Sequence, residues 1–340
     1  MKRYSYLIVL GFLIGLFACN TTSEKQNTSD IADTLAPNAA LYSLNQKIEA
    51  DKNNDAAFIE CAEYYLLANN VDSALRDILI AIDIDKNNSR HYVALSDAYL
   101  AMGNPDKCHE ALEKAVQIDP ENKDAILKQA RLYLIMRDYE RCYKRLDDLI
   151  AIDRINPRAY YVGSIALLEE ADTAGAIKNL RIAIDQDPEF FDAQFQLGVL
   201  LSAQKDPLAI NYLQNALTIN PQAIQAYYQL GLFFQENNRL KSAVQTYQSI
   251  LDIEPAYYPA LYNLGYINLV YQKDFAAAAD YFTQVINLVP DFAEAWYNRA
   301  YSYELMGKIN LARKDYQQTL VVKNNYPKAI EALNRLDGRQ

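Results

Sequence analysis

The chain has 340 residues and a formal net charge of −10, and 22% of its residues are charged, which is ordinary for a globular protein. Tyrosine is frequent (27 residues), whereas glycine (10) and proline (11) are too scarce for a strand-rich fold with many tight turns. The acidic balance argues against a nucleic acid partner, because phosphate backbones repel such a surface. Composition therefore favours an all-α protein whose long helices are joined by short turns.

The first 18 residues are typical of a signal peptide. Lys2 and Arg3 precede a 13-residue apolar run, 6–18, which would rise only about 20 Å as a helix and is too short for a hydrocarbon core of about 30 Å. The segment Leu16-Phe17-Ala18-Cys19 resembles the lipobox of bacterial lipoproteins, which implies cleavage before Cys19 and lipidation of that residue. The alternative is an ordinary signal peptide or an uncleaved anchor in which Cys19 has no role.

A lipidated Cys19 would hold the protein on a membrane of the bacterial cell envelope, because two acyl chains already anchor a protein stably. Asn20 takes the place of the Asp that retains enterobacterial lipoproteins at the inner membrane, so the outer membrane is favoured, on either face. Residues 19–40 are polar and lack apolar periodicity, which predicts a flexible tether with a reach of about 25 Å.

A repeat of 34 residues follows the tether. The segment Ile48–Asn54 is echoed by Ile82–Asn88, and later segments ending in Pro120, Pro188 and Pro290 keep the register. Self-similarity at this length predicts tandem helix-turn-helix units. The eight predicted units are 55–88, 89–122, 123–156, 157–190, 191–223, 224–257, 258–292 and 293–326. The fifth is one residue short and the seventh one residue long, and both differences fall near the turn between the two helices.

Three positions of each unit have the same character throughout the chain. Positions 8 and 20 are small, since two helices that cross closely leave no room for a large side chain, and position 24 is large and apolar. Position 8 is Ala62, Ser96, Ala130, Ser164, Gly198, Gly231, Gly265 and Ala300. Position 20 is Ala74, Cys108, Cys142, Ala176, Ala209, Ala243, Ala278 and Ala312. Position 24 is Ile78, Leu112, Leu146, Leu180, Leu213, Tyr247, Phe282 and Tyr316.

Residue by residue, this pattern resembles the tetratricopeptide repeat (TPR) family. The resemblance covers residues 55–326 and implies a right-handed α-solenoid of about eight repeats. The terminal repeats of a solenoid have one face without a neighbouring repeat, and this face must be covered by a capping helix. Residues 41–54 predict an N-terminal capping helix that resembles the second helix of a repeat without its first helix. Residues 327–340 predict a C-terminal capping helix, in which Ile330, Leu333 and Leu336 recur at helical spacing.

Cysteines 61, 108 and 142 form no CxxC pair and no metal-ligand spacing. They occupy repeat positions that favour small buried residues, where a free cysteine behaves as a small hydrophobe. A disulfide or redox role is the alternative.

In the TPR family, positions 2, 5, 6, 9, 12 and 13 of the first helices face a concave groove, which implies a binding surface here. Aromatic rings give contact area at low entropy cost, and amides pair with a peptide backbone. The candidate groove residues are the aromatics Tyr161, Phe195, Tyr228, Tyr262 and Tyr297 at position 5, the amides Gln196, Gln229, Asn263 and Asn298 at position 6, and Tyr266 and Tyr301 at position 9. The alternative is that these residues stabilise packing between repeats.

The groove positions of the N-terminal repeats carry charges of alternating sign, which predicts a solvated face. They are Glu60, Glu63, Arg90, Asp97, Asp124, Lys128, Arg131 and Arg158. The carboxylate clamp of chaperone adaptors needs Lys at position 5, where this chain has Ile59, Val93 and Leu127, so a chaperone tail is not the expected ligand.

The sequence predicts neither an enzyme nor a bound cofactor or metal. His91 and His109 are its two histidines, and no Ser-His-Asp, HExxH or glycine-rich phosphate motif occurs. The leading hypothesis is a membrane-tethered adaptor or scaffold that binds a segment of another envelope protein. The alternative is an envelope receptor for a glycan or other small ligand, with tyrosines stacking on sugar faces.

Overall fold

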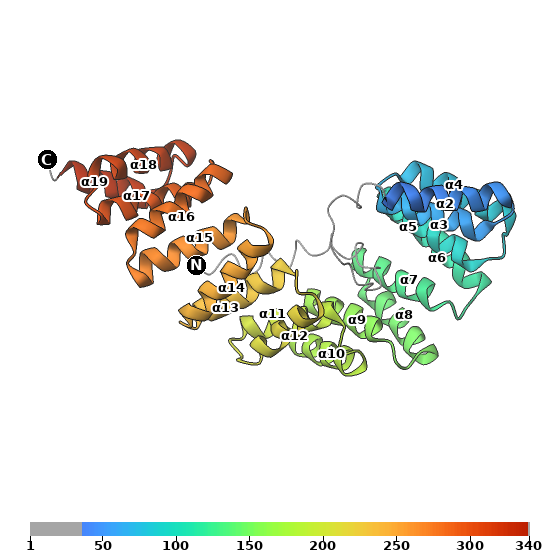
Figure 1. The fold of residues 1–340 in the computed structure, drawn as a ribbon. Coiled ribbons are helices and arrows are strands. Elements are labelled where there is room, and N and C mark those ends of the chain that lie inside the picture. Colours follow the sequence, from blue (N-terminus) through green and yellow to red (C-terminus); the bar gives the residue numbers. More distant parts are fainter. Residues whose placement is uncertain (1–35, 339–340) are drawn as a thin grey trace. The chain divides into compact units, whose positions relative to one another are not determined.

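The computed structural model describes residues 36–338, and every regular element in that range is a helix (Figure 1). The first helices of successive pairs are α3 (Asp55–Leu67), α5 (Ser89–Ala101), α7 (Lys123–Ile135), α9 (Pro157–Glu169), α11 (Phe191–Ala203), α13 (Ile224–Glu236), α15 (Tyr258–Ile267) and α17 (Ala293–Leu305). The second helices are α4 (Val71–Ile84), α6 (Pro105–Ile118), α8 (Tyr139–Ile152), α10 (Thr173–Gln186), α12 (Ala209–Ile219), α14 (Leu240–Ile253), α16 (Phe275–Leu288) and α18 (Ile309–Val322). A lone helix α2 (Ala36–Ala50) precedes the pairs and α19 (Pro327–Asp337) follows them, which confirms the predicted all-α class.

Each first helix passes into its second helix through one residue in the left-handed region, with φ between 56° and 73°. Such a residue reverses the chain and lets the next amides reach the last carbonyls of the helix. In the first pair, for example, the amide of Asn70 donates to the carbonyl oxygen of Tyr65 at 2.8 Å. The left-handed residues are Asn69, Gly103, Arg137, Ala171, Lys205, Asn238, Lys273 and Gly307.

The core follows the small-small-large pattern of the sequence. All residues at positions 8, 20 and 24 are buried, with exposed fractions of at most 4% wherever a side chain is present. Three glycines at position 8 let the large residue approach the helix backbone: a Cβ atom on Gly231 would lie 2.5 Å from Cε1 of Tyr247. Close crossing of the paired helices is therefore what requires the small residues.

The chain divides into two compact units, one ending at Pro188 and one beginning at Glu189. In the first, α3 to α10 each begin at an Asn or Asp whose side chain accepts a backbone amide hydrogen bond; such a cap typically stabilises a helix by about 1 kcal/mol. These caps are Asn54, Asn70, Asn88, Asn104, Asn122, Asp138, Asn156 and Asp172. Among the described helices of the second unit, α16 alone has such a cap, Asp274.

The two irregular repeats depart from the others at different places. In the fifth, Pro207 and Leu208 form a turn, and α12 begins only at Ala209. In the seventh, the extra residue is absorbed by a π-helical turn, η2 (Asn268–Gln272), which continues α15. The extra residue therefore lies beside the inter-helix turn, as the sequence predicts, and it widens the last turn of the first helix.

The lone helices differ in detail from their predictions. The helix α2 begins at Ala36, inside the segment predicted as tether, and packs on α3. In α19 the buried residues are Ala329, Ala332 and Leu336, whereas Ile330 is 41% exposed. The small alanines allow α19 to lie close to α18, and Leu333 packs against the same cluster. The predicted apolar face is therefore correct for Leu333 and Leu336 but wrong for Ile330.

The cysteines at 61, 108 and 142 are buried, unpaired thiols, as predicted. Burial raises the pKa of all three, to about 12 for Cys108 and Cys142, which suppresses the thiolate. Within residues 36–338, no helix combines the length and the apolar character that a membrane span needs.

Candidate functional site: the first-helix face

The predicted aromatic series is buried to different depths along the chain. Tyr161 and Phe195 are 6% and 4% exposed, so they belong to the core and present little surface. Tyr228, Tyr262 and Tyr297 are half-buried. Burial raises the pKa of each of these three phenols, so they are neutral donors or acceptors at physiological pH.

The position 6 amides connect neighbouring repeats. The Asn298 side chain donates from Nδ2 to Oη of Tyr262 at 2.9 Å, from one repeat to the preceding one. Asn263 donates in the same way to Oη of Tyr228, at a longer 3.4 Å. In the second unit, therefore, the amides at these two positions bond to tyrosines rather than lying ready for a peptide backbone, which supports a packing role.

Ring contacts hold the inner tyrosines further. The ring centroid of Tyr262 lies 5.6 Å from that of Phe282 and 5.1 Å from that of Phe292. Tyr297 contacts Tyr316 at 5.5 Å and Tyr326 at 5.2 Å. These distances are typical of favourable aromatic pairs, so the inner rings form a fixed support.

The outer side chains are more accessible. Tyr301 is 37% exposed and stacks on Tyr297 with ring centroids 6.5 Å apart and planes inclined by 12°. Tyr266 is half-buried and contacts Tyr271 at 6.3 Å. The residues Val270, Tyr271 and Leu305 are 43%, 44% and 42% exposed. We call Tyr266, Val270, Tyr271, Tyr301 and Leu305 the aromatic face.

Sequence reasoning found two of these five residues and missed the other three. Val270 and Leu305 stand at position 13 of their repeats, which the family pattern assigns to the groove, but neither is aromatic or polar, so their residue type does not mark them as binding residues. Tyr271 is exposed through the π-helical turn, which no sequence pattern predicts. The remaining predicted groove amides, Gln196 and Gln229, are half-buried.

The first helices of the N-terminal unit carry ionic contacts instead. Nζ of Lys128 lies 2.7 Å and 2.6 Å from the two carboxylate oxygens of Asp97, and 3.7 Å from Asp124. Burial raises the pKa of Asp97, and burial together with the charge of Asp97 raises the pKa of Glu63. The predicted solvated face is thus partly an inter-repeat ion pair between half-buried groups.

Both histidines lie in structural positions. His91 is 1% exposed, with Nε2 2.9 Å from Oδ2 of Asp55 and Nδ1 3.1 Å from the carbonyl oxygen of Asp85. The His109 ring lies 5.7 Å from that of Tyr133. Across residues 36–338, no group of three or more His, Cys, Asp or Glu side chains is arranged to hold a metal ion.

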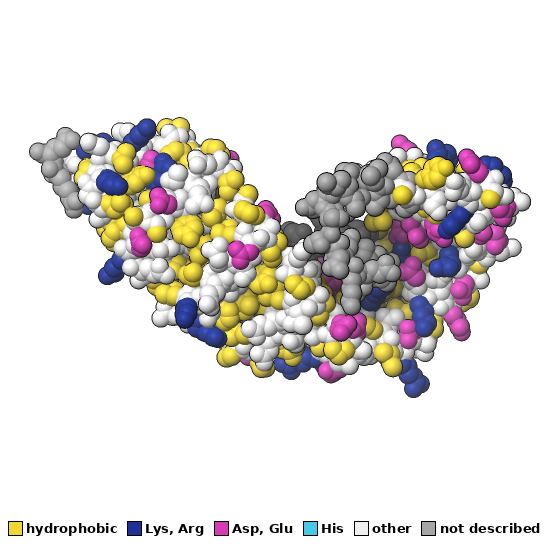
Figure 2. Space-filling model, viewed as in Figure 1, with side chains coloured by type: hydrophobic (Ala, Val, Ile, Leu, Met, Phe, Trp, Pro, Cys, Tyr) yellow, Lys and Arg dark blue, Asp and Glu magenta, His cyan; other side chains and the backbone are white. Residues whose placement is uncertain are grey.

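Side-chain types differ visibly between the units (Figure 2). Hydrophobic side chains predominate around α13 to α15, whereas Lys, Arg, Asp and Glu are more frequent over α3 to α8. An apolar face with few charges suits contact with a protein segment, because desolvating it costs little.

Comparison with known proteins agrees with the repeat geometry. Three segments, 99–162, 224–257 and 267–339, match the tetratricopeptide repeat family. The chain is a tetratricopeptide repeat protein. The TPR match at 224–257 has the same limits as the sixth repeat predicted from the sequence.

Similar TPR arrays are known in structure and in sequence. The Cut9–Hcn1 hetero-tetramer of the APC/C aligns with a TM-score of 0.50 and 18% identity, covering 98% of this chain and 62% of the other. PilF of Pseudomonas aeruginosa aligns with a TM-score of 0.51 and 22% identity, over 61% of this chain and 93% of its own. At such identities the likeness shows the TPR fold alone.

FlbA of Caulobacter vibrioides is 25% identical over 163 residues, which cover 48% of this chain and 27% of FlbA. The chain spans about a quarter or less of the length of the curated relatives it matches. The predicted signal peptide and Cys19 lie outside the described residues.

Proposed function

We propose that this TPR protein is a membrane-tethered adaptor that binds a segment of another cell-envelope protein on its aromatic face. The observation that carries the proposal is the exposure of Tyr301, Tyr271, Val270 and Leu305, between 37% and 44% each. The helix α15 and the turn η2 that continues it contain no charged residue. The proposed localisation, on the bacterial outer membrane through lipidated Cys19, is supported by the lipobox-like residues.

The aromatic face is suited to a partner because it is held rigidly. Tyr301 stacks on Tyr297, which itself packs on Tyr316 and Tyr326. A partner that contacts Tyr301 therefore meets a ring with little freedom left to lose, which reduces the entropy cost of binding. Apolar side chains of an extended or helical segment are the expected contacts.

Two classes of tyrosine variant separate binding from packing. Tyr266→Ala and Tyr301→Ala remove exposed contact area and leave the hydrogen bonds between repeats in place. Tyr262→Phe removes the acceptor of the Asn298 hydrogen bond and leaves the exposed rings in place. Tyr42→Ala is a matched control, because Tyr42 is 66% exposed but lies on α2.

The experiment is affinity capture from envelope extract with the full chain and each variant, followed by identification of the retained proteins. We expect Tyr266→Ala and Tyr301→Ala to lose partners that the wild type and Tyr42→Ala retain, at unchanged circular dichroism. Retention of the same partners by all variants would refute the binding role of the aromatic face. Quenching of tyrosine fluorescence by oligosaccharides, without protein capture, would instead support the glycan receptor.

The anchor has its own test. Growth with radiolabelled palmitate should label the wild-type protein, whereas Cys19→Ser should be unlabelled. Equal labelling of the two proteins would show that Cys19 is not the lipid attachment site.

A further inference from the structure

The outer face of α4 differs from that of the other second helices. At repeat positions 25 and 26 it carries Leu79 and Ile80, which are 49% and 36% exposed. The seven other second helices carry at least one polar residue at these positions. Their pairs are Glu113-Lys114, Asp147-Asp148, Arg181-Ile182, Gln214-Asn215, Gln248-Ser249, Thr283-Gln284 and Gln317-Gln318. The packing between helices that all repeats share therefore does not require the two apolar residues at these positions of α4.

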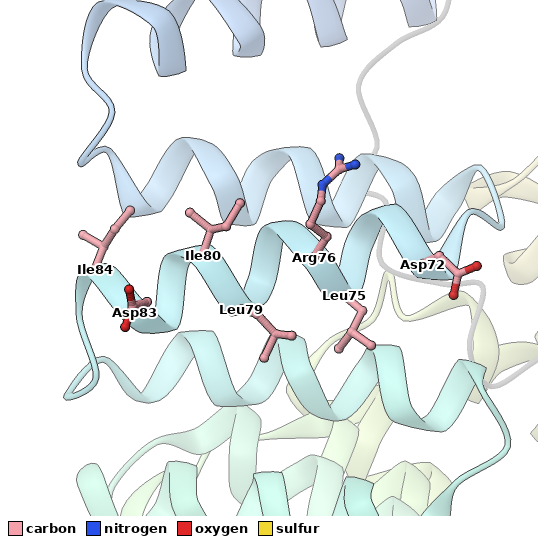
Figure 3. Close-up of a pocket in the computed structure, with 7 residues that line it drawn as sticks. All are labelled: Asp72, Leu75, Arg76, Leu79, Ile80, Asp83 and Ile84. Atoms are coloured by element: carbon pink, nitrogen blue, oxygen red, sulfur yellow. The ribbon is translucent and has the colours of Figure 1, made fainter.

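These residues are part of a longer strip that lines a shallow surface pocket. Figure 3 shows its seven side chains extending to both sides of a single helix, α4. The opposite side of α4 carries Ala74, Ile78 and Ala81, each 0% exposed, so most of the strip faces away from the core, whereas Leu75 at its edge packs against the core. We call this set the α4 strip: Asp72, Leu75, Arg76, Leu79, Ile80, Asp83 and Ile84.

The order of residues in the α4 strip is self-complementary. Two copies of α4 running antiparallel about a two-fold axis between Leu79 and Ile80 bring the Leu79 and Ile80 side chains of both copies together near the axis. The same register places Arg76 opposite Asp83 of the other copy, twice by symmetry. Apolar residues therefore meet at the axis, and opposite charges meet on either side of it.

The two charged groups of this register are available at the surface. The side chain of Arg76 is 62% exposed, although its Nε lies 3.0 Å from Asp77 on the same helix. The side chain of Asp83 is 84% exposed and lies 3.4 Å from Lys86. An apolar centre with a charged pair at each end is the pattern that interfaces use for a buried core and a polar rim.

We propose that the α4 strip is the interface of a two-fold symmetric homodimer of this chain, in which Arg76 pairs with Asp83 of the second copy. This interface lies on α4 of the first compact unit and shares no residue with the aromatic face, which belongs to the second unit. The contact of one helix pair is smaller than a standard interface of about 800 Å² per partner, so the dimer forms at high protein concentration.

The first test is the oligomeric state of the full chain in a density-matched detergent, measured by sedimentation equilibrium over a wide concentration range. We expect a monomer–dimer equilibrium that Leu79→Glu weakens at least tenfold. Gln317→Glu is the matched control, because it adds the same charge at position 25 of another second helix, and it should leave the equilibrium unchanged. A wild type that stays monomeric at every concentration, or a dimer that Leu79→Glu does not weaken, overturns the proposal.

The second test decides the register by exchanging charges. Arg76→Asp alone places two acids opposite each other, and Asp83→Arg alone places two cations opposite each other, so each variant should dimerise at least tenfold more weakly than wild type. A mixture of the two variants restores both ion pairs, so fluorescence energy transfer between differently labelled variants should report heterodimers. Failure of the mixture to associate more tightly than either variant overturns the antiparallel register.

A bilayer is the competing occupant of the α4 strip. The Cys19→Ser chain without residues 1–18, incubated with phosphatidylglycerol vesicles, should stay at the bottom of the flotation gradient. Flotation that Leu79→Glu abolishes would assign the strip to lipid and overturn the homodimer.

Discussion

The contact between Gly231 and Tyr247 allows a quantitative prediction about the helix crossing. A Cβ atom on Gly231 would lie 2.5 Å from Cε1 and 2.9 Å from Cδ1 of Tyr247, whereas carbon atoms in contact prefer about 3.5–4.0 Å. The ring is 0% exposed, and its hydroxyl donates to Oε1 of Gln235 at 3.0 Å, so it has little room to move. The Gly231→Ala variant therefore overpacks the sixth repeat.

The expected magnitude follows from two opposing effects. In an unconstrained helix, replacing Gly by Ala stabilises by about 0.5–1 kcal/mol. Overpacking a well-packed core costs about 1–3 kcal/mol, so the second effect should win and Gly231→Ala should destabilise by about 1–2 kcal/mol. Gly163→Ala is the control, because its Cβ would come close to the flexible end of the Asn179 side chain, at 2.9 Å, and would make an ordinary contact with Leu146 at 3.5 Å. That variant should be neutral or stabilising.

A double-mutant cycle tests the cause. Tyr247→Leu removes the ring and should cost about 2–4 kcal/mol alone, because a cavity remains. With Gly231→Ala added, the new methyl group occupies part of that cavity. The double variant should therefore lose less stability than the sum of the two single variants, by at least about 1 kcal/mol. The assay is urea unfolding of the full chain followed by circular dichroism. Additive losses, or stabilisation by Gly231→Ala, would refute the close-crossing argument.

Other predictions concern charges and turns. Arg299→Met should lower the free energy of unfolding, measured in urea, by about 3 kcal/mol. Asp315 is only 5% exposed, and the variant removes both hydrogen bonds that Arg299 donates to it in a buried ion pair. Replacing left-handed Ala171 by Gly should stabilise by about 0.5 kcal/mol, whereas Gly103→Ala, with open space around its Cβ, should destabilise by about 1 kcal/mol; equal effects would contradict the φ argument. Glu63 has a raised folded pKa, so its ionisation costs stability as pH rises above its ordinary value of 4.5. The Glu63 side chain is exposed, so solvent screening keeps the effect small. Glu63→Gln should therefore raise the free energy of unfolding at pH 7 by only a few tenths of a kcal/mol and should lose that gain at low pH. A gain that instead grows as the pH falls would contradict the raised pKa of Glu63.

Much of the fold could be predicted because the same pattern of small and large residues occurs in all eight repeats. The small residue at position 8, as at Ala62, and the large one at position 24, as at Ile78, recur in the sequence at a spacing that itself indicates paired helices. The division at Pro188 could not be predicted in this way, because the small-small-large pattern continues unbroken across it.

The candidate site was predicted only in part. Position 5 is aromatic from Tyr161 onwards, but the pattern cannot tell Tyr161, which is 6% exposed, from a half-buried ring such as Tyr262. That difference depends on which neighbours cover each ring. Nor does an asparagine such as Asn298 show in the sequence whether it bonds to the preceding repeat or to a ligand.

The π-helical turn in the seventh repeat has a consequence for how the array tolerates changes in length. The side chain of Asn268 donates to the carbonyl oxygen of Leu264 at 2.8 Å, and the amide of Asp274 bonds to the carbonyl oxygen of Asn268 at 3.0 Å. These bonds give the carbonyl oxygens of Leu264 and Asn268 partners at the widened turn, and Ala278 and Phe282 beyond it remain 0% exposed. An inserted residue is thus contained within a single turn, and later repeats keep their register. A residue inserted at such a turn can add a surface side chain while the core of the repeat stays unchanged.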